Sequence, residues 1–223
     1  MEDDAAEFIG RIGNRAVWAA ISTHEGEETV IAETDSALRL KFANLLTFVA
    51  PRHPVRGAEV TELLRKNGSL VAQRSNNEPV LDDTQFYVFD TVGELGLVYR
   101  LAKVAFIGGS LIPHGGQNLL EAAKLNCAIL HGPYMTNFLD IVEEMREAEA
   151  VEEITNSEEL AKAVARLLKE DVLHSLRVST AAEIAASKYC VLESVIEELT
   201  PFLKQLSRRP NVADPPTRCH AGT

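Results

Sequence analysis

Short apolar runs of strand length alternate along the chain with stretches whose apolar residues recur at helical spacing. The runs predict seven strands, of which the last is the weakest: residues 16–22, 45–50, 69–73, 85–89, 104–108, 127–131 and 151–154. Glycine, proline or capping residues stand where one kind of segment gives way to the other. This alternation is typical of a parallel sheet built from βα units.

The stretches at helical spacing predict seven helices: residues 27–41, 57–66, 93–103, 119–125, 138–147, 158–169 and a long terminal segment, 172–206. Pro201 is expected to kink or break the last one, because proline lacks the N–H that a helix interior needs. Right-handed crossovers place such helices on both faces of the sheet. The prediction is an α/β fold with a doubly wound, mostly parallel, Rossmann-like sheet and a long C-terminal helical segment.

Composition and charge narrow the function classes. The chain has 223 residues and 46% hydrophobic content, and 22 basic against 33 acidic residues give a net charge of −11. Such a charge repels phosphate backbones, so nucleic acid is not an expected partner. No apolar run reaches the roughly 18 residues of a membrane-spanning helix. The three cysteines lie far apart and form no metal-ligand spacing, which favours buried thiols in a reducing compartment.

Ligands of such sheets bind outside the carboxyl ends of the strands, so the loops there are the candidate site. After the fifth strand, two glycine pairs flank a short loop that contains Ser110 and His114 and leads to a helix start at Asn118. Glycines let a ligand approach the backbone, and N–H groups at a helix start attract anions. The alternative is that the glycines only permit tight turns.

Two further loops share this edge. Pro51 and Pro54 hold the turn after the second strand extended and present Arg52, whose planar guanidinium suits a phosphate. A glycine-bearing helix start at Gly93 and Glu94 follows the fourth strand. The sequence therefore predicts three loops that converge on one anionic ligand. It contains no DxD motif, and metal-free chemistry is favoured.

Several residues at these loops have two interpretations. Asn118 and Glu121 have the spacing of a capping box, as do Thr91 with Glu94 and Ser22 with Glu25. Glu121 could instead accept hydrogen bonds from sugar hydroxyls. His24 fits a loop histidine as well as a ligand or inter-domain contact, and Trp18 belongs either in the core or at a domain interface.

Four motifs in order carry a family resemblance: WAAISTHEGEE at 18–28, APRHP at 50–54, DTVGELG at 90–96 and GGSLIPHGGQNLLE at 108–121. Over residues 16–206 the chain resembles 3-deoxy-D-manno-octulosonic acid (Kdo) transferases. That resemblance implies one half of a GT-B glycosyltransferase, the C-terminal half that binds the donor CMP-Kdo, and inverting, metal-independent transfer. It implies no cofactor besides the donor substrate. Gln117 stands where the family usually has histidine.

The resemblance also implies the donor-binding residues. Arg52 would hold the CMP phosphate together with the helix starts near Gly93 and Asn118, and Glu121 would accept from the ribose hydroxyls. The remaining implied contacts are Pro51, Gly93 and Glu94 beside the nucleotide, and Ser110 and His114 within reach of the sugar or phosphate.

What lies outside these motifs is expected from the family. The catalytic general base, the lipid A precursor acceptor of lipopolysaccharide synthesis and the membrane contact would belong to an N-terminal half. Residues 1–15 would be its lead-in, 16–206 the CMP-sugar-binding domain, and 207–223 a disordered tail. Bacterial relatives work at the cytoplasmic face of the inner membrane, and plant relatives are mitochondrial. The alternatives are a non-catalytic nucleotide-sugar-binding module and a GT-B enzyme that uses UDP-sugars.

Overall fold

The structure, a computed structural model, describes residues 2–206, so the predicted tail 207–223 lies outside the described residues. The described residues up to 186 form one compact unit, and those from 187 to 206 belong to a second. The described part of the second unit, 187–206, is helical. The predicted lead-in 1–15 is part of the first unit.

A single parallel sheet of seven strands forms the centre of the first unit, in the order β3-β4-β2-β1-β5-β6-β7. Its strands are β1 (Val17–Thr23), β2 (Leu46–Pro51), β3 (Val71–Gln73), β4 (Phe86–Val88), β5 (Val104–Ile107), β6 (Ala128–His131) and β7 (Val151–Glu153). All seven predicted strands are confirmed, and all strand pairs are parallel. The β1, β2, β5 and β6 strands are buried throughout except for Ser22, as their unbroken apolar runs require.

The helices are α1 (Glu2–Ile12), α2 (Glu27–Arg39), α3 (Gly57–Lys66), α4 (Leu95–Leu101), α5 (Leu120–Lys124), α6 (Leu139–Glu147), α7 (Ser157–Lys169) and α8 (Asp171–Leu206). Short 3-10 turns, η1 (Pro54–Arg56) and η2 (Thr136–Phe138), precede α3 and α6. The seven predicted helices are confirmed, with ends that differ by up to two residues. The helix α8 continues through Pro201 to Leu206, so of the predicted kink or break the break is wrong: one missing N–H does not by itself end a helix.

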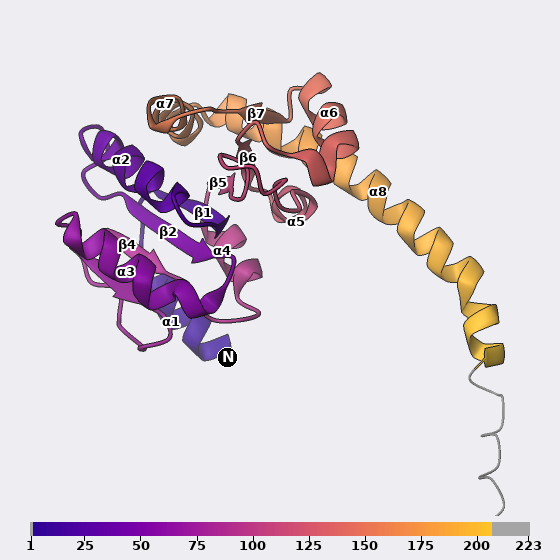
Figure 1. The fold of residues 1–223 in the computed structure, drawn as a ribbon, viewed down its shortest axis with the longest axis horizontal. Coiled ribbons are helices and arrows are strands. Elements are labelled where there is room, and N and C mark those ends of the chain that lie inside the picture. The colour runs from indigo at the N-terminus through magenta and orange to yellow at the C-terminus, as the bar shows by residue number, and fades with distance from the viewer. Residues whose placement is uncertain (1, 207–223) are drawn as a thin grey trace, which may run out of the picture. The chain divides into compact units, whose positions relative to one another are not determined.

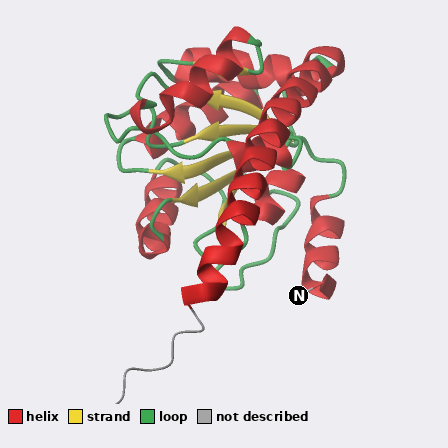
Figure 2. Ribbon diagram, turned by 90° about the vertical axis from the view of Figure 1, so that its right-hand side faces the viewer, coloured by secondary structure: helices red, strands yellow, loops and turns green. Residues whose placement is uncertain are grey.

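Two hydrophobic clusters cover the two faces of the sheet, which makes a three-layer sandwich (Figures 1 and 2). Besides strand residues, one cluster contains residues of α1, α4, α5, α6 and α8, and the other contains residues of α2, α3, α7 and α8. Trp18 is completely buried in the second cluster, so its interpretation as a core residue is confirmed. Cys127 is buried as a free thiol, and burial raises its pKa.

The α1 helix, which the sequence analysis did not predict, packs on the sheet. Its Phe8 ring lies edge-on to Tyr87 and Phe89 of the β4 segment, with centroids 4.9 and 5.7 Å apart. Phe8 and Ile12, four residues apart on one helix face, are both buried. That spacing is the signal that predicts the helix.

Candidate functional site

Strand order brings the loops that follow β1, β2, β4 and β5 together at one edge of the sheet, because these four strands are neighbours and parallel. We call residues 24–26, 52–56, 89–94 and 108–119 the rim. The His24 ring lies 4.3 Å from that of His114 and 6.1 Å from that of His53. The Asp90 carboxylate lies against Gly57, where an added Cβ would be only 2.2 Å from Oδ2. These contacts place the loops after β1, β2 and β5 side by side at this edge, and the loop after β4 against the start of α3.

Glu27 links two of these loops from inside the protein. Its carboxylate is fully buried and accepts backbone hydrogen bonds from Gly109 (2.7 Å), Ser110 (3.1 Å) and Leu111 (3.0 Å), and from His24 (2.9 Å). The amides of the glycine loop thus already hold an anion, which is the protein's own side chain. No role was predicted for Glu27 from the sequence.

Glu28, the next residue, binds the loop on the other side. Its buried carboxylate accepts from the Thr23 hydroxyl (2.9 Å) and pairs with Arg56 (2.8 Å), which also binds Glu59 (2.9 Å). Adjacent carboxylates at the start of α2 therefore fix the loop after β5 and the loop after β2. Their place inside the 18–28 motif, directly after a buried strand, was the available signal.

The glycines of the rim serve close packing within the protein. A Cβ on Gly116 would be 2.2 Å from the Met135 sulfur, and one on Gly115 would be 2.5 Å from the Asn137 side chain. Both residues have positive φ angles, of 88° at Gly115 and 75° at Gly116. The alternative interpretation, that these glycines permit tight turns, therefore holds for this pair.

We predict that Gly108→Ala destabilises the protein. An added Cβ would be 2.6 Å from the Ser22 carbonyl oxygen and 2.7 Å from the Thr23 Cα, both backbone atoms of the neighbouring strand. Overpacking of this kind costs about 1 to 3 kcal/mol. Thermal unfolding measures the cost, and Gly96→Ala, where the nearest atom would be 3.5 Å away, is the matched control. Equal melting temperatures for the two variants would contradict the prediction.

Arg52 stands exposed at the carboxyl end of β2. Its backbone N–H donates to the Thr23 carbonyl (3.0 Å), which anchors the turn, and the preceding Pro51 is buried. Within residues 2–206, no carboxylate pairs with the Arg52 guanidinium. A positive charge is therefore presented at the rim with its hydrogen-bond donors available.

The helix start after the glycine loop differs from the capping-box prediction. The Asn118 side chain accepts from the Leu120 N–H (2.9 Å) rather than from residue 121, and α2, α4 and α5 begin without a side-chain cap. The capping-box predictions are wrong at all three sites. Glu121 is exposed, and its carboxylate has no hydrogen bond within the described part of the chain. This arrangement favours the alternative role, acceptance from a ligand.

The other predicted site residues fall into two groups. Gly93 and His114 are exposed on the rim, and Gly93 has a φ of 88°. Ser110 is fully buried: its hydroxyl donates to the Ile107 carbonyl and accepts from the Gly132 N–H, which fixes the loop from within. The structure thus places the Ser110 side chain away from the exposed surface of the rim.

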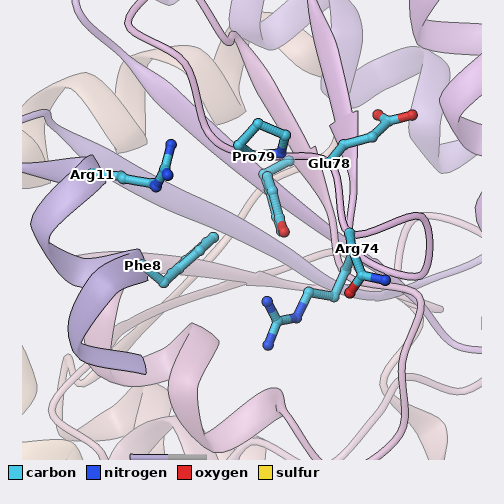
Figure 3. A pocket seen from close by; sticks show the side chains of 7 residues that line it. Phe8, Arg11, Arg74, Glu78 and Pro79 are labelled. Carbon is cyan, nitrogen blue, oxygen red and sulfur yellow. The ribbon is translucent and has the colours of Figure 1, made fainter. Parts of the chain in front are cut away.

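Glu94 is already paired in the structure. Its carboxylate accepts from the Arg74 guanidinium (2.6 Å) and from the Thr91 hydroxyl, and the bond to Arg74 lowers its pKa. Arg74 also lines a pocket of about 310 Å³, where its guanidinium lies 5.8 Å from the Phe8 ring centre (Figure 3). Arg74 and Glu78 of this pocket have ion-pair partners, Glu94 and Arg65, so the open charges at the rim are the stronger candidates for a ligand.

No three His, Cys, Asp or Glu side chains among the described residues are arranged to hold a metal ion. No described helix is long and apolar enough to cross a membrane.

Comparison with known proteins identifies this arrangement. The C-terminal CMP-Kdo binding domain of WaaA from Acinetobacter baumannii has the same fold, with a TM-score of 0.77 and 33% identity over 82% of this chain and 96% of that one. Fold and rim define a Rossmann-like half of a GT-B glycosyltransferase. A 3-deoxy-D-manno-octulosonic acid transferase from Haemophilus influenzae is 34% identical over 193 residues. The chain belongs to the Kdo transferase family.

The chain spans less than half the length of the curated relatives that it matches. The alignment with the Haemophilus protein includes 86% of this chain but only 45% of that protein. The alignment with a probable mitochondrial Kdo transferase from Arabidopsis thaliana, at 35% identity, includes 80% of this chain but only 41% of that protein. No family model matches the sequence. The aligned part corresponds to the C-terminal domain of the Acinetobacter protein.

Proposed function

We propose that the chain binds the CMP moiety of CMP-Kdo at its rim and acts as the donor-binding half of a Kdo transferase. The observation that carries the proposal is the pair of open charges at one sheet edge, the Arg52 guanidinium and the Glu121 carboxylate. The first has the donors for a phosphate, and the second has the acceptors for ribose hydroxyls. Family membership, with a relative whose aligned domain is named for CMP-Kdo binding, supports this assignment.

Arg52 would act on the leaving group. As the glycosidic bond breaks, negative charge grows on the CMP phosphate, and a fixed cation beside that phosphate stabilises the transition state. Gly93, His114 and Asn118 line the same rim, where Asn118 holds the start of α5. We propose that transfer proceeds with inversion and needs no cofactor besides the donor.

The rest of the reaction would require a further domain. A lipid A precursor as acceptor, the catalytic general base and the membrane contact are all assigned, in this proposal, to an N-terminal half of the kind that the longer relatives contain. The compartment would be the mitochondrion for a plant protein and the cytoplasmic face of the inner membrane for a bacterial one.

Titration calorimetry with CMP tests the binding proposal directly. We expect CMP to bind more tightly than UDP, and Glu121→Ala to weaken CMP binding about tenfold, since a charge-assisted hydrogen bond contributes about 1.5 kcal/mol or more. Glu33→Ala, which removes an exposed carboxylate of α2, is the matched control with unchanged affinity. Preference for UDP would favour a UDP-sugar enzyme, and absence of binding to either nucleotide would overturn the proposal.

Activity assays then separate an enzyme half from a binding module. The chain alone should form no product from CMP-Kdo and a lipid A precursor, and the N-terminal half of a relative should restore activity when it is added. A chain that binds CMP and yet supports no transfer with any such half would indicate a non-catalytic nucleotide-sugar-binding module.

A further inference from the structure

His24 carries an unsatisfied nitrogen at the rim. Its Nε2 atom is buried and has no hydrogen-bond partner, although the residue as a whole is only half-buried. An added Cβ on Gly109 would be 3.3 Å from this nitrogen, so glycine leaves room for the imidazole against the loop after β5. A buried polar atom without a partner is costly, and a bound proton and ligand would satisfy it.

The His24 ring is also part of a cluster of like groups. It stacks on His114 with an interplanar angle of 20° and lies edge-on to His53 at 87°. Two imidazoles stacked 4.3 Å apart repel one another if both carry a charge. An anion that enters the rim would bring a negative charge close to these rings, and this charge would stabilise a proton on the imidazole.

Charged groups around His24 come from every element that packs on it. Arg52 and His53 follow β2, His114 belongs to the loop after β5, and Glu28 lies at the start of α2. Burial lowers the pKa of His24. The neighbouring His114, His53 and Arg52 lower it further, whereas Glu28 raises it. The surroundings of His24 in the ligand-free rim therefore favour the neutral imidazole.

We propose that the stacked imidazoles of His24 and His114 take up one proton when an anionic nucleotide occupies the rim, so that nucleotide affinity depends on pH. This inference rests on the proposed function, because it assumes that the nucleotide phosphate binds beside Arg52. The proton comes from the buffer and is released again when the nucleotide leaves.

The direction of the pH dependence follows from the thermodynamic linkage between proton binding and nucleotide binding. Binding of an anion raises the pKa of the imidazole above its ligand-free value, so the protonated protein binds more tightly. The gain is complete below the ligand-free pKa, and it is lost as the pH rises through the pKa of the complex. Affinity is therefore higher at pH 6 than at pH 8.

The probe is cytidine 5′-methylphosphate, a phosphodiester whose single charge does not change between pH 6 and pH 8. Calorimetry should give an affinity about three- to tenfold higher at pH 6 than at pH 8. In two buffers of different ionisation enthalpy, it should also report uptake of up to one proton. His24→Gln and His114→Gln should each bring the affinity ratio close to one and remove the proton uptake.

The control is His174→Gln, because that ring bonds to the Lys103 carbonyl, in the loop before β5 at the other end of the sheet, and the variant should keep the full pH dependence. Because His114 is exposed, His114→Gln should fold normally, so it tests the inference even if His24→Gln folds poorly. Binding without pH dependence, or with proton uptake unchanged in both rim variants, would overturn this inference alone. Absence of binding at every pH would overturn the proposed function together with it.

Discussion

Replacing Arg52 with alanine is expected to weaken CMP binding by about ten- to a hundredfold, the loss that goes with a charge-assisted contact of about 1.5 to 3 kcal/mol. The guanidinium is exposed, and within the described residues it pairs with no carboxylate. Its removal would therefore take away the proposed phosphate contact without leaving a buried partner unsatisfied. The melting temperature should stay unchanged while the affinity measured by calorimetry falls.

Two variants make this result specific. Arg100→Ala removes an exposed arginine from the last turn of α4, at the far end of that helix from the rim, and should leave CMP affinity as it is. Arg52→Lys retains the charge but loses the planar fork, so its affinity should lie between those of the wild type and Arg52→Ala. Equal CMP affinity in the wild type and Arg52→Ala would remove Arg52 from the site.

Replacing Glu27 with alanine should cause the largest loss of stability. Four backbone N–H groups would lose their acceptor, the fully buried Glu27 carboxylate, and two of these four hydrogen bonds are themselves fully buried. Unsatisfied buried donors cost about 1 to 3 kcal/mol each before relaxation, so a total of about 4 kcal/mol is expected. In a chain of this size, that loss lowers the melting temperature by about 10 °C.

The matched control for Glu27 is its exposed neighbour Glu25, whose replacement by alanine should leave the melting temperature within about 1 °C, as for most surface changes. The melting temperature of Glu27→Gln should lie between those of Glu27→Ala and Glu25→Ala. The amide retains one acceptor oxygen but turns an N–H₂ group toward backbone donors. A melting temperature for Glu27→Ala that matches that of Glu25→Ala would show that the carboxylate does not hold the two loops together.

The buried strands and the α1 helix show how far the local sequence pattern predicts structure. Buried strands are predictable here because they read as continuous apolar runs bounded by turn residues. The α1 helix was missed although Phe8 and Ile12 have helical spacing, because nothing local shows that this segment packs on the aromatic residues of β4.

The sequence by itself determined the parallel α/β order, the loops at the carboxyl edge and the exposed Arg52, because periodicity and turn chemistry depend on neighbouring residues. Tertiary structure alone decided that the amides of the glycine loop bind Glu27, which lies 82 to 84 residues away in sequence. It likewise decided that Ser110 faces inward and that His24 stacks on His114. Such contacts arise from the pairing of β1 with β5, and the residues on either side of one loop cannot specify them.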